Sequence, residues 1–597
     1  MKKYVEKSLI LTLALMLALS STGCMCTYLT YRGVEEALKT PAPTAEPLLM
    51  DFGTAAKGHS DVHFTDMRFD EPDIAALHDE IDAMQSALSD GVDAETLFSR
   101  FDAALRAFES ADSELSLLYV KYALDVTKTE YQDQYAELLD ELQGVDIALT
   151  DLAMAILDSP AYGAEARTRW GEDFVNAVIE GDRLSSPEIQ EDLAAEQKLT
   201  FEYDNIISGY TLNRDGREWT LDAAGEAYYA GELAFEDYLS IYSDYCAGLN
   251  EAAGAVFLKL LPLRERIAKT LGYGSYAAYR YECYSRDYTV EDAKALHAAV
   301  KKYISPLYAE AVSVSTAAYE LKDVTFSLNG YLAALQRMTE DFAPEVSEAL
   351  NYMLRNGLYD FEVSSNKMVG SFTTYFSDER APFMFSQWEG SAGNVRTVIH
   401  ELGHFTRFYQ GISDGWCVTE SLDLDEVDSQ ALELLFTAYY DTFFGGNIDA
   451  AVSEMLLDGM YAVITGCMED EFQQEIYQNP SMTLDEINAL YKRLAGEYGF
   501  DDLYGYDGTE WVMISHTFQS PMYYISYAVS IIAAFEIWQE SLADYDAARE
   551  DYVSILKRPA YSELRRTTSA YGLGDPLSAE TVRNLAETLR AQLIEEN

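Results

Sequence analysis

Basic residues are scarce in this chain. Lysine and arginine number 42 against 101 aspartate and glutamate residues, which gives a formal net charge of −59. A surface of this sign repels phosphate groups, so the composition argues strongly against binding to nucleic acid or to anionic lipid. The acidic residues are spread over predicted helix faces, and we interpret most of them as a solubilising surface. Attraction of cationic peptides into a negatively charged cleft is the alternative.

Cysteine is also scarce. The whole chain has six, and the four that follow the N-terminal region show neither the spacing of a disulfide framework nor a metal-binding pair. Buried, free thiols are therefore predicted for Cys246, Cys283, Cys417 and Cys467.

Long apolar runs are nearly absent, and the clearest one lies at the N-terminus. Residues 9–19 are apolar, follow three lysines and precede a stretch of small residues that ends in Cys24. The run is too short to cross a bilayer, which takes about 20 residues, so it predicts a secretory signal peptide over residues 1–23. A cysteine directly after small residues resembles a bacterial lipobox, which predicts that Cys24 is lipidated and holds the protein at a membrane.

Prolines follow the signal peptide. Pro41, Pro43 and Pro47 lie among alanine and threonine, and they predict an extended tether over residues 24–65. We therefore expect an extracytoplasmic lipoprotein anchored at the cell surface, with no further membrane span. A plain cleavable signal, with Cys24 and Cys26 incidental, is the alternative.

The remaining chain has the apolar spacing of helices. One series begins after Asp70 and Pro72, which resemble a helix cap and a first-turn proline, and it ends at Gly91. Its members recur at three- and four-residue steps: Ile74, Leu77, Ile81, Met84 and Leu88. The predicted class is all-α, interrupted by a strand-like interval at residues 361–385. We place a helical region at residues 66–200 and a second region at residues 201–597.

The clearest chemistry lies in the pentapeptide His400-Glu401-Leu402-Gly403-His404. On a helix the two histidines are one turn apart and face the same side, so both can bind one metal ion. Glu401 then lies beside the ion, where it can act as a base on zinc-bound water. Because the chain has only seven histidines, chance gives this pattern in roughly one such sequence in a hundred. The motif therefore predicts a zinc site.

A third protein ligand has to come from another segment. In the extended form of the motif a glycine and a third histidine follow, but those positions here are Arg407 and Gln410. A carboxylate from a later helix is the remaining common choice. Spacing alone does not separate the candidates, which are Glu420, Asp423, Asp425, Glu426, Asp428 and Glu433.

Around the motif the chain resembles a known family, the oligopeptidase F-like branch of the thimet-oligopeptidase (M3) zinc peptidases. Glu426-Val427-Asp428-Ser429 matches the Glu-Val-x-Ser step of that family. Similar segments lie at residues 266–276, 366–372, 381–383, 395–399 and 511–528, so the resemblance covers roughly residues 260–560. Two departures are Arg407, where another histidine is common, and Met522, where phenylalanine usually precedes the tyrosine.

This resemblance implies a fold, a metal site and a reaction. The fold is two-lobed and all-α, with a deep substrate channel and a small β element beside the zinc helix, whose edge pairs with extended peptide. One Zn²⁺ per chain is implied, held by His400, His404 and Glu426 within a catalytic region over residues 201–597. The implied reaction is endopeptidase cleavage of oligopeptides by attack of zinc-bound water, with Glu401 as general base.

The resemblance also assigns transition-state contacts. His516, Tyr523 and Tyr527 are implied to donate hydrogen bonds to the substrate or to the developing oxyanion. We expect both tyrosines on one helix, where a spacing of four residues puts them on the same face and Tyr524 on another. An aromatic core helix with a packed structural histidine is the alternative.

Two other functions stay open from the sequence. A carboxypeptidase or dipeptidyl carboxypeptidase on a related scaffold recognises a free C-terminal carboxylate, for which Lys367 or Arg407 would be available. A non-catalytic, peptide-binding surface lipoprotein would have no use for the base Glu401.

Overall fold

The computed structural model describes residues 58–595, apart from residues 185, 230, 323, 369 and 412–420. The predicted signal peptide, Cys24, most of the tether, Cys417 and Glu420 lie outside the described residues, so the predictions made for them stay predictions. The described part of the chain is predominantly helical with two small sheets, which confirms the predicted fold class.

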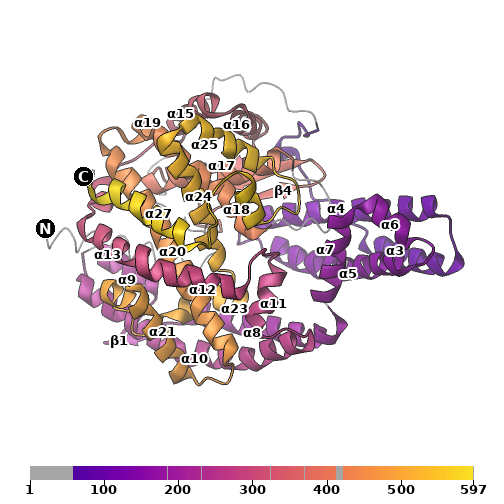
Figure 1. Cartoon of the computed structure of the whole chain (residues 1–597), viewed down its shortest axis with the longest axis horizontal. Helices are drawn as coiled ribbons and strands as arrows, with labels where there is room; N and C mark the ends of the chain where they lie inside the picture. Colours follow the sequence, from indigo (N-terminus) through magenta and orange to yellow (C-terminus); the bar gives the residue numbers. More distant parts are fainter. Residues whose placement is uncertain are drawn as a thin grey trace.

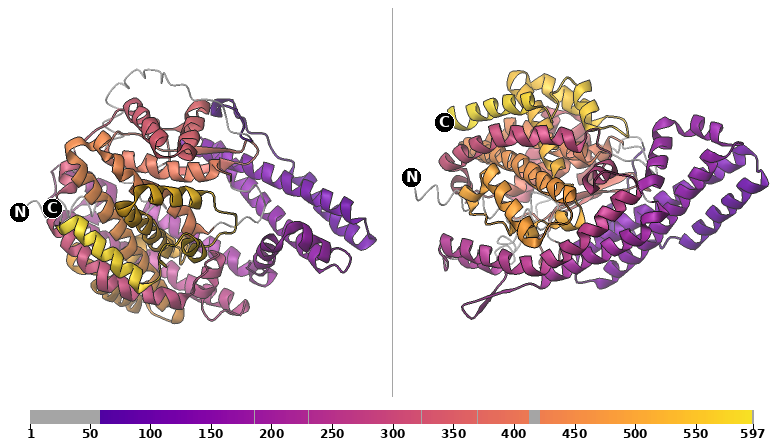
Figure 2. Two further views of the ribbon diagram at one scale, coloured as in Figure 1. Left: turned by 45° about the horizontal axis from the view of Figure 1, so that its top comes forward. Right: turned by 60° about the horizontal axis from the view of Figure 1, so that its bottom comes forward.

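The N-terminal helices form a bundle that projects from the rest of the molecule (Figures 1 and 2). They pack against one another around a hydrophobic core of their own. The cap of the first helix is Asp73, whose side chain accepts a hydrogen bond from the amide of Ala76. The predicted cap Asp70 and the predicted first-turn proline Pro72 both lie before this residue, outside the helix. Gly91 ends this helix in the left-handed conformation. The bounds are α3 (Ile74–Asp90), α4 (Ala94–Leu124), α5 (Thr129–Asp158), α6 (Gly163–Trp170) and α7 (Glu172–Leu184).

The larger part of the molecule packs around a second hydrophobic core, which the C-terminal end of α4 joins through Leu117 and Val120. The predicted boundary at residue 200 stays a prediction. The helices of this part are α8 (Gln190–Gly209), α9 (Leu221–Tyr229), α10 (Phe235–Thr270), α11 (Tyr276–Cys283), α12 (Val290–Ala299), α13 (Ser305–Val314), α14 (Ala317–Leu321), α15 (Leu328–Phe342), α16 (Pro344–Asn356), α17 (Ala392–Tyr409), α18 (Leu422–Leu435), α19 (Tyr440–Phe444), α20 (Ile448–Gln478), α21 (Leu484–Tyr498), α22 (Phe500–Tyr504), α23 (Ser515–Gln519), α24 (Ile525–Ala543), α25 (Tyr545–Leu556), α26 (Leu564–Ala570) and α27 (Ala579–Arg590).

The strand-like interval before the zinc motif forms a small sheet, as predicted. Its strands are β3 (Tyr359–Asp360), β4 (Phe372–Phe376) and β5 (Ala381–Phe385), in the order β3-β5-β4. β5 pairs parallel with β3 and antiparallel with β4, so β4 lies at an edge. Both β4 and β5 pack against α17, which places the edge strand beside the helix of the zinc motif. A separate hairpin joins β1 (Leu212–Arg214) to β2 (Arg217–Trp219).

Two helical stretches of the described chain, Glu236–Thr270 and Leu422–Gln478, have the length and composition of membrane spans. Buried residues make up 56% and 72% of their most apolar windows, as in core helices of a folded body. Among the cysteines that the structure describes, Cys246 and Cys467 are buried free thiols, as predicted, whereas Cys283 is a free thiol that is only partly buried.

Candidate metal and catalytic site

The zinc motif lies in the middle of α17, and local sequence explains why the helix begins where it does. Ser391 and Asn394 form a reciprocal capping box that satisfies two amides at the first turn. The helix then buries most of its surface against α18, α16 and the small sheet. As a result His400 and Glu401 are 4% and 1% exposed, so both act in a medium far less polar than water.

Gly403 lets α18 approach α17 closely enough to share the site. A Cβ atom at Gly403 would lie 2.5 Å from the carbonyl oxygen of Asp428 and 2.6 Å from the Cα of Ser429. Because glycine has no side chain, the two helix backbones can cross at this point. The crossing brings Glu426, one turn earlier on α18, to the histidines.

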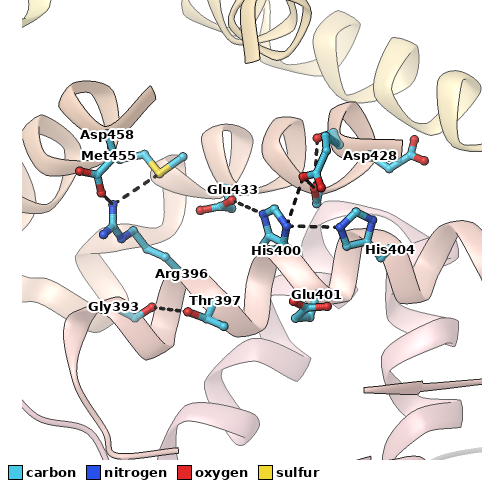
Figure 3. A network of polar contacts seen from close by, with 12 residues as sticks. Gly393, Arg396, Thr397, His400, Glu401, His404, Asp428, Glu433, Met455 and Asp458 are labelled. Carbon is cyan, nitrogen blue, oxygen red and sulfur yellow. Dashed lines mark hydrogen bonds and ion pairs between the residues drawn. The ribbon is translucent and has the colours of Figure 1, made fainter. Parts of the chain in front are cut away.

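Three side chains meet at this crossing (Figure 3). His400 Nε2 lies 3.2 Å from His404 Nε2 and 3.5 Å from Glu426 Oε2. One potential ligand atom from each of the three residues lies within 4.8 Å of the other two. Burial lowers the pKa of His404 well below its usual range and raises the pKa of Glu426. Burial thus favours the neutral form of both groups, which keeps a lone pair on the His404 ring and leaves Glu426 poised to ionise beside a positive ion. Two imidazoles and one carboxyl group are a donor set that suits a divalent cation.

Two polar groups on α18 orient these side chains, and sequence reasoning had not given either of them this role. His400 Nδ1 donates to Glu433 Oε1 at 2.7 Å, which places the lone pair of the neutral ring on Nε2, the nitrogen that faces His404 and Glu426 (Figure 3). Ser429 Oγ lies 3.4 Å from Glu426 Oε2, and it also donates to the carbonyl oxygen of Glu426. Glu433 follows Glu426 by two helical turns and was one of the candidate ligands, but this spacing alone does not separate a contact with His400 from exposure to solvent.

Glu401 contacts the edge strand. The hydroxyl of Thr373 on β4 donates to Glu401 Oε2 at 2.8 Å and lies 3.1 Å from the backbone oxygen of the same residue. Burial raises the pKa of the Glu401 carboxyl to about 7, although nearby His400 and the Thr373 hydrogen bond act in the other direction. A carboxyl with this pKa can take up and release a proton near neutral pH.

The other acidic candidates on α18 have different partners. Asp428 forms a two-pronged ion pair with Arg558, with N–O distances of 2.6 and 2.9 Å, and both side chains are almost fully buried. Asp425 lies 3.5 Å from the same guanidinium. Asp423 lies 3.7 Å from Arg286. Glu426 is therefore the candidate that the described structure places beside both histidines.

The rings of His516, Tyr523 and Tyr527 lie close to one another, and their role in catalysis stays a prediction. The His516 ring lies 5.2 Å from the ring of Tyr523 and 6.1 Å from that of Tyr527, and the two tyrosine rings are 5.2 Å apart. Burial lowers the pKa of His516 to about 4, so the ring is neutral near pH 7 and has one N–H to donate. Tyr527 lies on α24, which packs against α18, the helix of Glu426.

Two details of this cluster differ from the prediction. Tyr523 precedes α24, which begins at Ile525, because the chain at Met522 adopts a φ of 66° that interrupts the helix. Tyr524 was expected to face away, yet its ring lies 4.9 Å from that of His516. The tyrosines meet through a turn and not through a shared helix face, and Tyr524 belongs to the same cluster.

The side chains that a carboxypeptidase could use are engaged inside the fold. Lys367 Nζ contacts the carboxylate of Asp360 and the carbonyl oxygen of Glu362. Arg407 Nη1 donates to the carbonyl oxygens of Leu556 and Arg558 at 2.8 and 3.2 Å. These contacts do not favour either residue as the anchor for a substrate carboxylate.

Comparison with known proteins agrees with the resemblance seen in the motifs. Residues 325–585 match the model of peptidase family M3. The chain is 24% identical over 256 residues to the chromosomal oligoendopeptidase F of Lactococcus lactis subsp. cremoris. That alignment covers 39% of this chain and 40% of the relative, so it spans well under half of either protein.

Solved structures match over more of the chain. PZ peptidase A with inhibitor 2 has a TM-score of 0.75 at 22% identity, and the match covers 89% of this chain and 99% of that one. A protein assigned as an oligoendopeptidase F has a TM-score of 0.74 at 23% identity and covers 89% and 98%. At these identities the likeness establishes the fold, which these proteins share.

Proposed function

We propose that this chain, whose residues 325–585 match peptidase family M3, is a zinc-dependent endopeptidase for short peptides. The observation that supports it most is the group of His400, His404 and Glu426 around one point, with Glu401 beside it. Glu401 argues against a binding module without activity, since metal binding and peptide binding need no base.

The donor set fits zinc. With metal–ligand bonds of about 2.0–2.2 Å, ligand atoms of a tetrahedral zinc site lie roughly 3.3–3.6 Å apart. The distances from His400 Nε2 to His404 Nε2 and to Glu426 Oε2 are 3.2 and 3.5 Å. The hydrogen bond from His400 Nδ1 to Glu433 is the orienting contact usual for a zinc-bound histidine. We therefore assign His400, His404 and Glu426 as the residues that would hold one Zn²⁺.

The chemistry divides between the ion and the chain. When bound, zinc supplies a Lewis acid that makes water more acidic and polarises a carbonyl. Glu401 takes the proton of the attacking water on its carboxylate and passes it to the leaving amine. Thr373 holds that carboxylate in place through its hydroxyl. His516, Tyr523 and Tyr527 donate hydrogen bonds to the substrate or to the oxyanion.

The substrate is proposed to be an extended oligopeptide. β4 is an edge strand of its sheet and lies beside α17, where a peptide backbone can add as a further strand. A free C-terminal carboxylate is not required in this arrangement. The predicted channel between lobes and the cell-surface location are part of the same proposal.

Metal analysis and one peptide assay test this function. We expect one zinc per chain and cleavage of an internally quenched peptide whose C-terminus is amidated. Glu401→Gln is expected to keep its zinc and its thermal stability while kcat falls by about 10²–10⁴-fold, because only the base is lost. Cleavage of free-acid peptides alone would favour the carboxypeptidase, and wild-type turnover in Glu401→Gln would remove the proposed mechanism.

A further inference from the structure

The segment of residues 516–527, called here the tyrosine segment, has an irregular backbone. It runs from the short helix α23 to the start of α24, and Met522 within it has a φ of 66°. Carbonyl groups at a helix end and in an irregular turn have no helical partner, so they need donors from elsewhere in a buried environment. The amide groups of such a turn need acceptors in the same way, and the amide of Met522 donates to Gln473 Oε1 at 2.8 Å.

Arg264 on α10 supplies donors at the start of the segment. Its side chain is fully buried, and its guanidinium donates from Nη1 to the carbonyl oxygen of Thr517 at 2.9 Å and from Nη2 to that of Phe518. Nε donates to Glu196 at 2.6 Å, which balances the charge. One guanidinium thus fixes two consecutive peptide groups directly after His516.

Arg280 on α11 and the following Tyr284 supply donors in the middle. Tyr284 donates its hydroxyl hydrogen to the carbonyl oxygen of Pro521 at 3.2 Å. Arg280 Nη2 lies 2.6 Å from the hydroxyl of Tyr284, and its Nε lies 3.5 Å from the same carbonyl oxygen. The ring of Tyr284 also contacts the ring of Tyr523 edge to face, at 5.9 Å between centroids.

Arg286 supplies donors at the end of the segment. Its Nη2 donates to Ser526 Oγ at 2.9 Å and approaches the carbonyl oxygen of Tyr523 at 3.4 Å. Its Nε lies 3.7 Å from Asp423, in the first turn of α18. Both charged side chains are at most 1% exposed. Arg286 therefore joins the tyrosine segment to the helix that carries Glu426.

Filling the space around the tyrosine segment does not require buried charges. Burying a guanidinium and a carboxylate is costly, and apolar residues of similar size often replace such pairs without loss of stability. Three arginines nevertheless converge on the backbone of the tyrosine segment: Arg264 from α10, Arg280 from α11 and Arg286 from the loop that follows α11. A planar guanidinium suits this purpose because it presents several donors in a rigid fork, which lysine does not.

We propose that Arg264, Arg280 and Arg286 form an arginine clamp, whose members are positioning residues that fix His516, Tyr523 and Tyr527 for transition-state contacts. The proposal rests on the proposed function. Hydrogen-bond donors of this kind lose much of their effect when they move by a fraction of an ångström. The clamp acts on the backbone, so it sets where the donors stand and makes no contact with substrate itself.

Hydrogen–deuterium exchange and kinetics on the full chain test the clamp together. The variants are Arg286→Lys, which keeps the charge beside Asp423 but loses the fork, and Tyr284→Phe, which removes one hydroxyl and keeps the ring. The matched control is Tyr308→Phe, which removes a buried hydroxyl bond to Tyr504, 2.8 Å long, on α13. We expect amides of residues 516–527 to exchange at least tenfold faster in Arg286→Lys and severalfold faster in Tyr284→Phe, with no change in the control.

The kinetic readout separates positioning from stability. We expect kcat to fall about 10–100-fold in Arg286→Lys, with KM within about threefold and zinc at one per chain. If Arg286→Lys does not fold, Tyr284→Phe carries both measurements, with a kcat loss of about 3–10-fold. Unchanged exchange in the folded variants, or faster exchange with unchanged kcat, overturns the clamp. An inactive wild-type enzyme would instead overturn the proposed function, while the exchange rates would still report on the clamp.

Discussion

His400 meets two carboxylates through its two ring nitrogens. Nδ1 donates to Glu433 at 2.7 Å, whereas Nε2 faces Glu426 and His404. A nitrogen that carries a hydrogen cannot bind a metal ion, so the contact with Glu433 selects the tautomer that has its lone pair on Nε2. The two acids therefore differ in role although both contact the same histidine.

This difference predicts the zinc affinity of three variants. Glu426→Ala removes one of three ligands and is expected to leave the protein without stoichiometric zinc. Glu433→Ala keeps all three ligands but loses the orienting bond, so its affinity is expected to fall about 10–100-fold. Asp425→Ala is the control on the same helix, and its affinity for zinc is expected to equal that of the wild type. Competition with a chelator measures all three, and the ligand assignment fails if Glu433→Ala loses zinc completely while Glu426→Ala retains it.

At the scale of elements, the close approach of α17 and α18 depends on one residue without a side chain. Gly403→Ala is expected to push α18 away, because the new Cβ would lie 2.5 Å from a backbone oxygen that cannot rotate aside. Overpacking of this kind typically costs about 1–3 kcal/mol. We expect a lower melting temperature together with weaker zinc binding, since Glu426 moves with α18.

Gly181 in α7 provides the comparison for this change. A Cβ atom there would meet nothing within 4 Å, so Gly181→Ala is expected to stabilise the protein slightly, because alanine favours the helix. Thermal unfolding and zinc titration of the two variants test the argument. Zinc affinity in Gly403→Ala equal to that of the wild type would show that the helix crossing does not hold the site together.

The tyrosine segment gives the second prediction at this scale. If Tyr523 or Tyr527 donates to the oxyanion, replacing it with phenylalanine is expected to lower kcat by about 10²–10³-fold with little change in KM and full zinc content. Because the ring of Tyr524 also contacts His516, Tyr524→Phe is not a neutral control, and Tyr308→Phe takes that place. Steady-state kinetics of these variants tests the assignment. If kcat of both Tyr523→Phe and Tyr527→Phe stays within about threefold of the wild type, neither tyrosine is an oxyanion donor.

The helical class, the helix of the zinc motif and the small sheet could be predicted because each depends on the order of residue types along one stretch of chain. Apolar spacing indicated the helices, and a run of strand-forming residues indicated the sheet. Glu433 was not assigned its role, since an acid two turns along a helix has the same pattern whether it contacts a histidine or solvent. The expectation that Tyr523 and Tyr527 lie on one helix was wrong, because a positive φ at Met522 cannot be read from the spacing of residues. The clamp joins residues more than 200 positions apart, such as Arg286 and Ser526, and only the fold brings them together.

At the scale of the whole molecule, basic residues are few, and several of the strongest cationic contacts lie in the interior. Arg264, Arg286 and Arg558 are almost fully buried and bind groups on α23, α18 or the tyrosine segment. Each of these arginines is paired with a carboxylate that is itself largely buried, so the pairs add no net charge and the excess of acidic residues that gives −59 lies elsewhere in the chain. Such an excess favours solubility and gives no electrostatic attraction to anionic lipid, so attachment to a membrane would have to come from another source.

That source is predicted to be a lipid on Cys24, and Cys24→Ser tests it. The described chain begins near the C-terminal end of the zinc helix, where His59 Nε2 lies 2.9 Å from the carbonyl oxygen of Tyr409. The tether predicted before it lies outside the described residues and stays a prediction; a proline-rich segment of such a length can in general span about 100 Å, so an anchor on Cys24 is not expected to affect the site.

We therefore expect Cys24→Ser to move the protein from the membrane fraction to the soluble fraction while kcat/KM for a soluble peptide stays unchanged. Labelling with a fatty-acid analogue should mark the wild-type protein and not the variant. Cys26→Ser is the matched control, because it removes a neighbouring thiol and is expected to keep both label and membrane attachment. Equal membrane retention of Cys24→Ser and the wild type would mean that the body itself binds the membrane, against the argument from its charge.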